Sequence, residues 1–173
     1  LDNLPILDMK GEDYINPYKS NWQFRYYQEL FDIEYDKDII KEICINYLEG
    51  LEWTFKYYND GCYDWSWCYK YNYPPLLEDL IKYIPSFNTT LIEKKEKNPI
   101  HKYTQLSYVL PKNSLSLLPT KVKNKLLEKY QHIYCENCKI IMHFCRYFWE
   151  SHVELPHIDI KDLNLFIISL NKI

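Results

Sequence analysis

Apolar positions recur at helical spacing over residues 36–58, and this pattern predicts the longest helix of the chain. Asp36 precedes the pattern as a candidate N-cap, because its carboxylate can accept hydrogen bonds from the first free amides. Gly50 costs about 1 kcal/mol relative to alanine inside a helix. Its presence indicates that another backbone or a bulky ring packs closely against it. The predicted core-facing positions are Ile39, Ile40, Ile43, Cys44, Tyr47, Leu48, Leu51 and Phe55.

Shorter patterns organise the rest of the chain. Residues 138–154 alternate and are rich in β-branched and aromatic side chains, which predicts one or two strands. Asp159 is positioned to cap a final helix. The pattern as a whole predicts an α+β fold that is predominantly helical, with a small β-sheet near residues 138–155. Ordered structure is expected from residue 22, and further helices near residues 75–83, 104–110 and 119–130.

The segments without periodicity suggest how the chain divides. Residues 1–21 carry Pro5, Gly11 and Pro17 and are predicted to form an extended N-terminal arm. The remaining residues 22–173 suffice for a single domain with its own core. Residues 87–98 are polar and charged without a core stripe, so we expect a mobile surface loop there.

Composition and charge narrow the functional classes. The formal charge of −3 excludes a uniformly basic nucleic-acid-binding surface, although a local groove stays compatible with it. No apolar run reaches the roughly 18 residues of a membrane span, and the first ten residues lack a signal-peptide layout. We therefore expect a soluble intracellular protein without a membrane partner, cytoplasmic or nuclear.

The aromatic content, 17% of the residues, is concentrated in one segment. Residues 62–75, CYDWSWCYKYNYPP, place two tryptophans and four tyrosines directly after the long helix and its turn. Flat rings held on a rigid turn can stack on unpaired nucleobases, each stack contributing roughly 1–3 kcal/mol. The simpler interpretation is that these rings fill the core where loop meets helix. Composition alone leaves both interpretations open.

Four stretches in order resemble signatures of the Xrn family of 5′→3′ exoribonucleases. Residues 47–58 (YLEGLEWTFKYY), followed by the aromatic segment, are similar to the family's "GLxWxxxYY" and "GCxSWxWYYPYHYAP". Residues 99–119 resemble its "PFxQLxxVLPxxSxxLLP" segment, and residues 146–159 (RYFWESHVELPHID) its "WExxxxLPFID" turn. The segment WQFRYYQELF, residues 22–31, where ordered structure is expected to begin, looks like the family's "WKxRYYxxKF".

This resemblance implies a role in degrading RNA that carries a 5′-monophosphate. It identifies the chain with the second conserved region of the family, which braces the active site and stacks on RNA through a tryptophan loop. The matching positions are Trp65 and Trp67, and the sequence does not say which ring stacks. The acids that hold divalent metal, expected to be Mg²⁺, belong to the first conserved region, outside this chain. We therefore expect no catalytic residue and no metal ligand here, and an isolated chain that is inactive.

The expected partners follow from the same resemblance. They are RNA and the missing N-terminal catalytic region, supplied by the same polypeptide or by a partner chain. The loop also departs from the family pattern, where Ser, Tyr, Pro, His and Ala are usual. An anionic side chain at the first of these positions would repel phosphate unless it is paired. The departures are Asp64, Cys68, Lys70, Asn72 and Pro74.

Three alternatives compete with this hypothesis. A zinc site is conceivable because Cys135-x-x-Cys138 lies near His132, His143 and Cys145, but buried core thiols fit the resemblance better. A cation site is conceivable at the acidic residues 32–38, although such residues near a helix start are usually solvated. The chain could also be a non-catalytic scaffold or interaction subunit that retains this half of the exonuclease fold.

Overall fold

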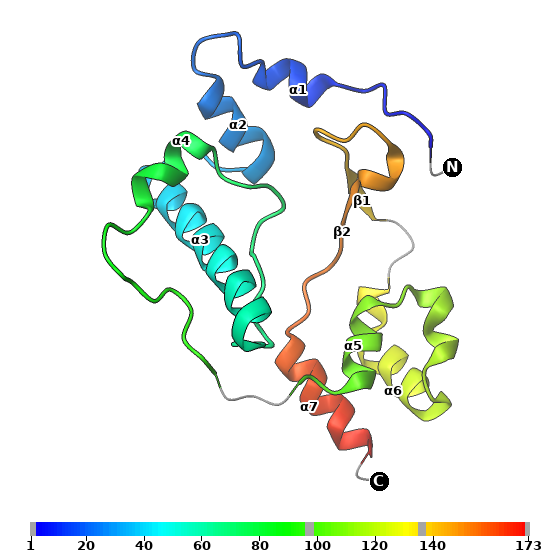
Figure 1. Ribbon diagram of the computed structural model, residues 1–173. Coiled ribbons are helices and arrows are strands. Elements are labelled where there is room, and N and C mark those ends of the chain that lie inside the picture. The colour runs from blue at the N-terminus through cyan, green and yellow to red at the C-terminus, as the bar shows by residue number, and fades with distance from the viewer. Residues whose placement is uncertain (1–2, 96–98, 135–137, 172–173) are drawn as a thin grey trace. The chain divides into compact units, whose positions relative to one another are not determined.

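The long helix predicted from periodicity is present and is the longest helix among the described residues (Figure 1). The computed structural model describes residues 3–95, 99–134 and 138–171. α3 spans Lys37–Asp60, and the Asp36 carboxylate caps it by accepting the amides of Asp38 (2.7 Å) and Ile39 (3.3 Å). The predicted N-cap is therefore confirmed.

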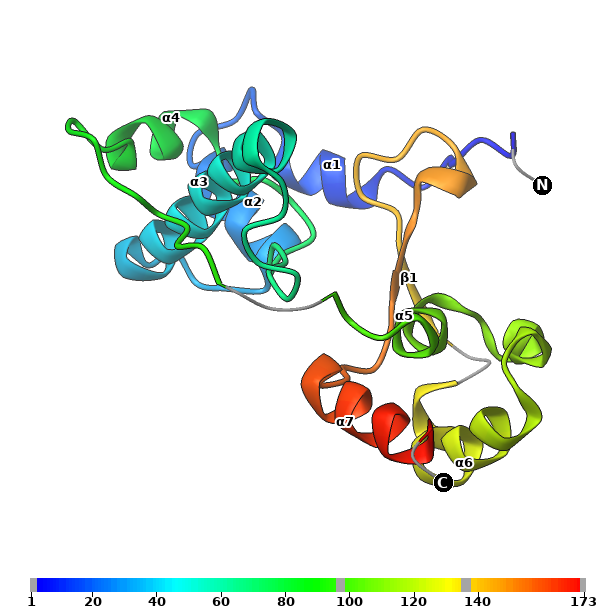
Figure 2. The same ribbon diagram turned by 60° about the horizontal axis from the view of Figure 1, so that its bottom comes forward.

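The described chain is mainly helical with one two-stranded antiparallel sheet, which confirms the predicted fold class. Figure 2 shows the same elements from a second direction. The strands are β1, Lys139–Ile141, and β2, His152–Glu154. The other helices are α1 (Lys10–Ile15), α2 (Trp22–Phe31), α4 (Leu77–Leu80), α5 (Lys102–Val109), α6 (Thr120–Tyr130) and α7 (Ile160–Asn171), with 3-10 turns η1 (Ile81–Tyr83), η2 (Lys112–Leu117), η3 (Gln131–Ile133) and η4 (Phe148–Glu150).

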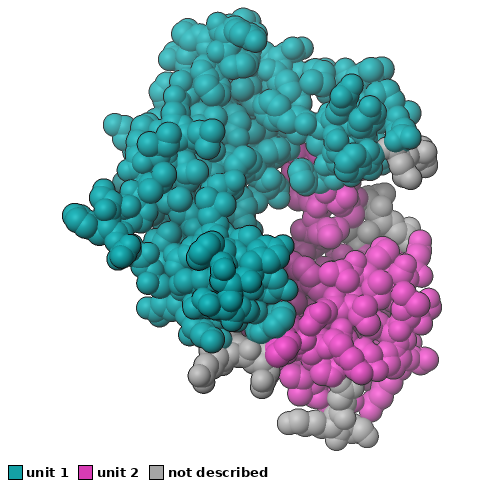
Figure 3. Space-filling view, in the orientation of Figure 1, with its two compact units in different colours: residues 1–97, 142–152 teal, residues 98–141, 153–173 magenta. Residues whose placement is uncertain are grey.

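Two compact units make up the structure (Figure 3). Unit 1 comprises residues 1–97 and 142–152, and unit 2 comprises residues 98–141 and 153–173. That residues 22–173 form a single domain stays a prediction. No helix within the described residues is long and apolar enough to cross a membrane.

Unit 1 has its core where α2, α4 and η1 cover the first half of α3. Tyr27 of α2 is fully buried with Ile40 and Ile43 of α3. Three residues of the predicted apolar stripe are exposed: Ile39 by 38%, Leu51 by 52% and Phe55 by 69%. The core cluster of unit 1 takes residues of α3 only from Ile40 to Leu48, so the prediction that the whole apolar face is buried was too broad.

The N-terminal arm is not extended throughout its described part. α1 interrupts it and buries Ile15, while Gly11 lies so close to the His143 ring that a Cβ would meet its Nδ1 at 2.2 Å. Before α1 the arm pairs as extended backbone: the Ile6 amide donates to the Arg146 carbonyl at 3.1 Å.

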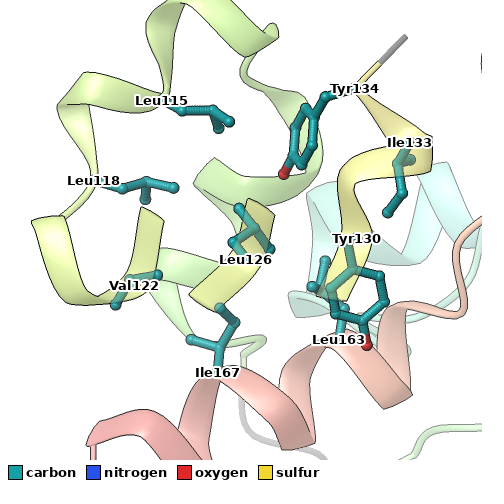
Figure 4. Close-up of a cluster of buried hydrophobic side chains, with 9 residues drawn as sticks. All are labelled: Leu115, Leu118, Val122, Leu126, Tyr130, Ile133, Tyr134, Leu163 and Ile167. Carbon is teal, nitrogen blue, oxygen red and sulfur yellow. The ribbon is translucent and has the colours of Figure 1, made fainter. Parts of the chain in front are cut away.

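Unit 2 encloses a mainly aliphatic core between η2, α6 and α7, to which Tyr130 and Tyr134 also contribute (Figure 4). Leu115, Leu126 and Ile167 are fully buried in it, and their side chains point toward one another. Asp159 accepts the amides of Lys161 (2.7 Å) and Asp162 (3.4 Å), so it caps α7 as predicted.

Candidate nucleic-acid interface

The tryptophan turn, residues 64–67, is closed by its own first side chain. Asp64 Oδ1 accepts hydrogen bonds from the Ser66 amide (2.9 Å) and the Ser66 hydroxyl (2.7 Å). The Trp67 amide donates to the Asp64 carbonyl at 3.4 Å. An aspartate that bonds to backbone two residues on fixes a turn. Trp65 therefore occupies a defined backbone position between two bonded neighbours.

Two groups from outside the turn anchor Asp64. The indole Nε1 of Trp53 on α3 donates to the Asp64 carbonyl at 2.9 Å. Lys95 Nζ lies 2.6 Å from Asp64 Oδ2. Asp64 itself is only 3% exposed, so both carboxylate oxygens are satisfied inside the protein. The turn is thereby tied to the long helix and to a distant segment at once.

The electrostatics of Asp64 follow from these partners. Burial by itself would raise the pKa of the carboxyl, but the hydrogen bonds from Lys95 and Ser66 outweigh it and lower the pKa to about 2. The group is therefore ionised at neutral pH and compensated by the Lys95 ammonium. Asp64 is a paired anion, so the repulsion of phosphate expected for an unpaired one does not apply.

Trp67 is packed onto α3. A Cβ placed on Gly50 would lie 2.6 Å from Trp67 Cη2, so the glycine leaves room for the ring. This confirms that a bulky ring packs against Gly50. The Trp67 ring also stacks on Trp53 (centroids 5.9 Å, 21°), and Trp53 stacks on Tyr57 (5.2 Å, 9°). Trp67 is accordingly part of a three-ring stack.

Trp65, two residues earlier, stays 43% exposed. The tyrosines that follow are turned inward instead. The Tyr69 hydroxyl donates to the Tyr73 carbonyl at 2.7 Å, and Tyr73 is 8% exposed. Tyr71 packs against Phe31 at 5.7 Å between ring centroids. The core-filling interpretation thus describes the tyrosines, whereas the side chain of Trp65 stays partly exposed to solvent.

The departures from the family pattern lie in different surroundings. Apart from buried Asp64, they are exposed. The Lys70 amide donates to the Asn46 side-chain oxygen at 3.0 Å, so its backbone is fixed while its ammonium faces solvent. The Pro74 carbonyl accepts the Tyr26 hydroxyl at 2.9 Å. The remaining exposed positions are Cys68 and Asn72.

The sequence alternatives for metal binding find no support in the described part of the chain. No group of three or more His, Cys, Asp or Glu side chains there could hold a metal ion. Cys135 lies outside the described residues. Cys145 is buried, and its Sγ bonds to the Glu150 carbonyl at 3.3 Å, as a core thiol does. Among the acids before α3, Asp36 serves as the helix cap.

Sequence reasoning missed the role of residues 91–95, which we name the strap. Ile92 is only 6% exposed, so the loop over residues 87–98 does contain a core residue. Lys95 supplies the ion pair to Asp64. The adjacent apolar pair Leu91 and Ile92 in a charged stretch has no periodicity, so the only signal was the opposite charge of a lysine-rich segment and Asp64.

Together, the fold and this turn define a mainly helical α+β module that presents an aromatic ring on an anchored loop. The chain belongs to the family described as the Xrn1 helical domain, whose sequence model matches residues 7–172. The resemblance inferred from its motifs is thereby confirmed.

Similar proteins carry the names of exoribonucleases. The chain is 29% identical over 165 residues to 5'-3' exoribonuclease 1 of Schizosaccharomyces pombe, covering 91% of this chain and 12% of that protein. It is 32% identical to 5'-3' exoribonuclease 2 of the same organism (87% and 15%) and of Gallus gallus (88% and 16%). The chain thus spans between 12% and 16% of the length of these curated relatives.

Proposed function

We propose that this chain is the helical part of a 5′→3′ exoribonuclease that degrades 5′-monophosphorylated RNA in the cytoplasm or nucleus, and that Trp65 stacks on an RNA base. The family and the names of its relatives support the activity. The exposed ring of Trp65 on an anchored turn is the observation that carries the stacking role. Trp67 supports the turn from within the three-ring stack.

Stacking suits this geometry for a physical reason. A ring carried on a backbone that is already fixed loses less conformational freedom when a base lies on it, so more of the contact energy appears as affinity. Base-on-ring contacts contribute roughly 1–3 kcal/mol and tolerate any sequence, because every base has a flat face. A processive nuclease needs such tolerance, since each nucleotide in turn must occupy the same place.

In this proposal, the hydrolysis step takes place outside this chain. The described residues contain no metal-holding group, and we propose that Mg²⁺ is held by the acidic catalytic region implied by the family resemblance. That region is the proposed partner, either in the same polypeptide or as a separate chain. This chain contributes the support and the stacking surface.

Binding of a 5′-monophosphorylated oligoadenylate, followed by fluorescence anisotropy, tests the stacking role. Trp65→Ala is expected to weaken binding about tenfold, the equivalent of about 1.4 kcal/mol. Its thermal midpoint should match that of the parent chain, because the ring is half outside the protein. Trp149→Ala is the matched control, since Trp149 is another exposed tryptophan, 62% accessible, and should bind RNA normally.

Two results would contradict the proposal. One is a parent chain that does not bind the RNA; the other is Trp65→Ala binding as tightly as the parent. Trp67→Ala should instead lower the thermal midpoint, because it removes a ring packed on Gly50 and Trp53. A nuclease assay with and without Mg²⁺ completes the test: the chain alone should release no nucleotides, and digestion by it would refute the division of labour.

A further inference from the structure

The strap, residues 91–95, is fastened to α3 by a charged pair. Glu52 Oε2 accepts the Leu91 amide at 2.8 Å, while Lys56 Nζ donates to the Ile92 carbonyl at 2.7 Å. Glu52 and Lys56 also pair with each other at 2.5 Å and are mostly buried. The Ile92 side chain is itself buried. The strap therefore has a fixed path along the second half of α3.

The end of the strap reaches the residues immediately before Trp65. The Lys95 amide donates to the Tyr63 carbonyl at 2.8 Å. The Lys95 ammonium donates to Asp64 Oδ2 at 2.6 Å. Lys56 lies over the Tyr63 ring, 4.6 Å from its centroid, and so contacts strap and loop together. One residue of the strap thus holds the backbone of Tyr63 and the side chain of Asp64.

The ion pair has a consequence for the turn. Asp64 Oδ1 holds the Ser66 amide and hydroxyl, so the carboxylate can close the turn only while it stays inside the protein. A buried carboxylate without a cationic partner is strongly disfavoured, and it would take up a proton or move into water. Either change weakens the bonds to Ser66, and the backbone at Trp65 then gains freedom.

We infer that Lys95 is a positioning residue for RNA binding: through Asp64 it holds the tryptophan turn in the conformation that presents the Trp65 ring. The inference rests on the proposed stacking role of Trp65. Lys95 acts here through Asp64 and not by contacting phosphate. The alternative is that Lys95 contacts an RNA phosphate directly. Its side chain is 54% exposed and cationic, and a lysine beside the RNA would attract phosphate.

A double-mutant cycle between positions 95 and 65 separates the two roles. The variants are Lys95→Met, which keeps the length of the side chain but not its charge, Trp65→Ala, and both together. Lys95→Arg restores a cation that can pair with Asp64. Lys94→Met removes the neighbouring positive charge and is the matched control. The probe is the 5′-monophosphorylated oligoadenylate used above.

We expect Lys95→Met to weaken RNA binding about fivefold, part of the effect of losing the stack. Lys95→Arg should bind within about twofold of the parent, and so should Lys94→Met. In the Trp65→Ala background, Lys95→Met should have no further effect. An equal loss in both backgrounds would show that Lys95 contacts RNA directly and would overturn the inference. So would unchanged binding by Lys95→Met when Trp65→Ala binds weakly.

A second measurement does not depend on RNA. The amides of Ser66 and Trp67 are bonded to Asp64, so Lys95→Met should accelerate their hydrogen exchange while the first turns of α3 keep theirs. Unchanged exchange at Ser66 and Trp67 would refute the positioning role even if RNA binding fell. If exchange accelerates but Trp65→Ala binds RNA normally, the strap positions the turn and the stacking function is the part that fails.

Discussion

The two compact units enclose different interiors. Unit 2 is filled mainly by aliphatic side chains together with Tyr130 and Tyr134, and its buried polar residues among those described are the uncharged Thr104 and Ser107. Unit 1 buries two carboxylates, Asp64 and Asp79, each paired with a lysine. Apolar burial has no preferred direction, whereas hydrogen bonds require particular distances and angles. The described part of unit 1 therefore uses charge-assisted bonds to hold the tryptophan turn in place, whereas unit 2 combines packed volume with uncharged bonds such as that of the Tyr134 hydroxyl to the Ser107 carbonyl at 2.6 Å.

The largest effect should come from the aliphatic interior of unit 2. Leu115→Ala empties a fully buried position and is expected to lower the free energy of unfolding by about 3 kcal/mol. Leu117 lies two residues later in the same η2 turn but is 70% exposed, so Leu117→Ala should change it by less than about 0.5 kcal/mol. Denaturant unfolding followed by circular dichroism compares them. Equal losses would show that this core is not packed as described.

The buried hydroxyl of unit 1 should come next. Tyr27 donates to Asp79 Oδ2 at 2.8 Å and accepts the Leu76 amide at 3.2 Å, with Lys82 on the other Asp79 oxygen at 2.7 Å. Tyr27→Phe removes both bonds without changing ring volume and should cost about 2 kcal/mol.

The matched control for this network is Tyr18→Phe. Tyr18 is 98% exposed, so its hydroxyl should be dispensable in the same unfolding experiment. A Tyr27→Phe variant as stable as the parent would mean that unit 1 does not depend on its directional bonds, and the contrast between the units would disappear.

The Asp64–Lys95 pair should make the stability of the protein depend on pH. The folded pKa of Asp64 is lowered to about 2 from an ordinary 3.8, so the pair stabilises the protein above about pH 4 and the stabilisation is lost as pH falls toward 2. At neutral pH it amounts to about 1–2 kcal/mol, after allowance for the half-exposed lysine.

Asp64→Asn tests this dependence when unfolding is measured from pH 7 to pH 2. Below about pH 2 the variant and the parent should converge in stability, while at pH 7 the variant is weaker. Asp60→Asn is the control, because it removes a nearby carboxylate that is exposed. A constant difference between Asp64→Asn and the parent at every pH would argue against an ionised, paired Asp64.

The smallest effect concerns Gly50, against which the Trp67 ring packs. Gly50→Ala gains about 1 kcal/mol in helix propensity, but the new methyl displaces the Trp67 ring, so the net change should be below about 0.5 kcal/mol. In a Trp67→Ala background the ring is gone, and the same substitution should stabilise by the full 1 kcal/mol. Unfolding free energies of the four chains complete the cycle, and equal effects in both backgrounds would place the ring elsewhere.

Much of the local structure was determined by the sequence alone. The long helix, its Asp36 cap, the ring against Gly50 and the Asp159 cap of the last helix all followed from periodicity and residue chemistry. The helix and its caps depend on neighbours a few residues away, where spacing along the chain sets spacing in space, whereas Gly50 indicated a close ring without indicating that it is Trp67. The ordered motifs likewise sufficed to recognise the family.

Only the tertiary structure decided which tryptophan is free. Trp65 and Trp67 look alike in sequence, and their difference arises from Gly50, Trp53 and Lys95. Lys95 is 31 residues from Asp64, a separation that no local pattern encodes. The same holds for buried Ile92 and for the exposed side chains of Leu51 and Phe55 on α3. Burial depends on which distant segments meet, and short-range periodicity carries no information about such meetings.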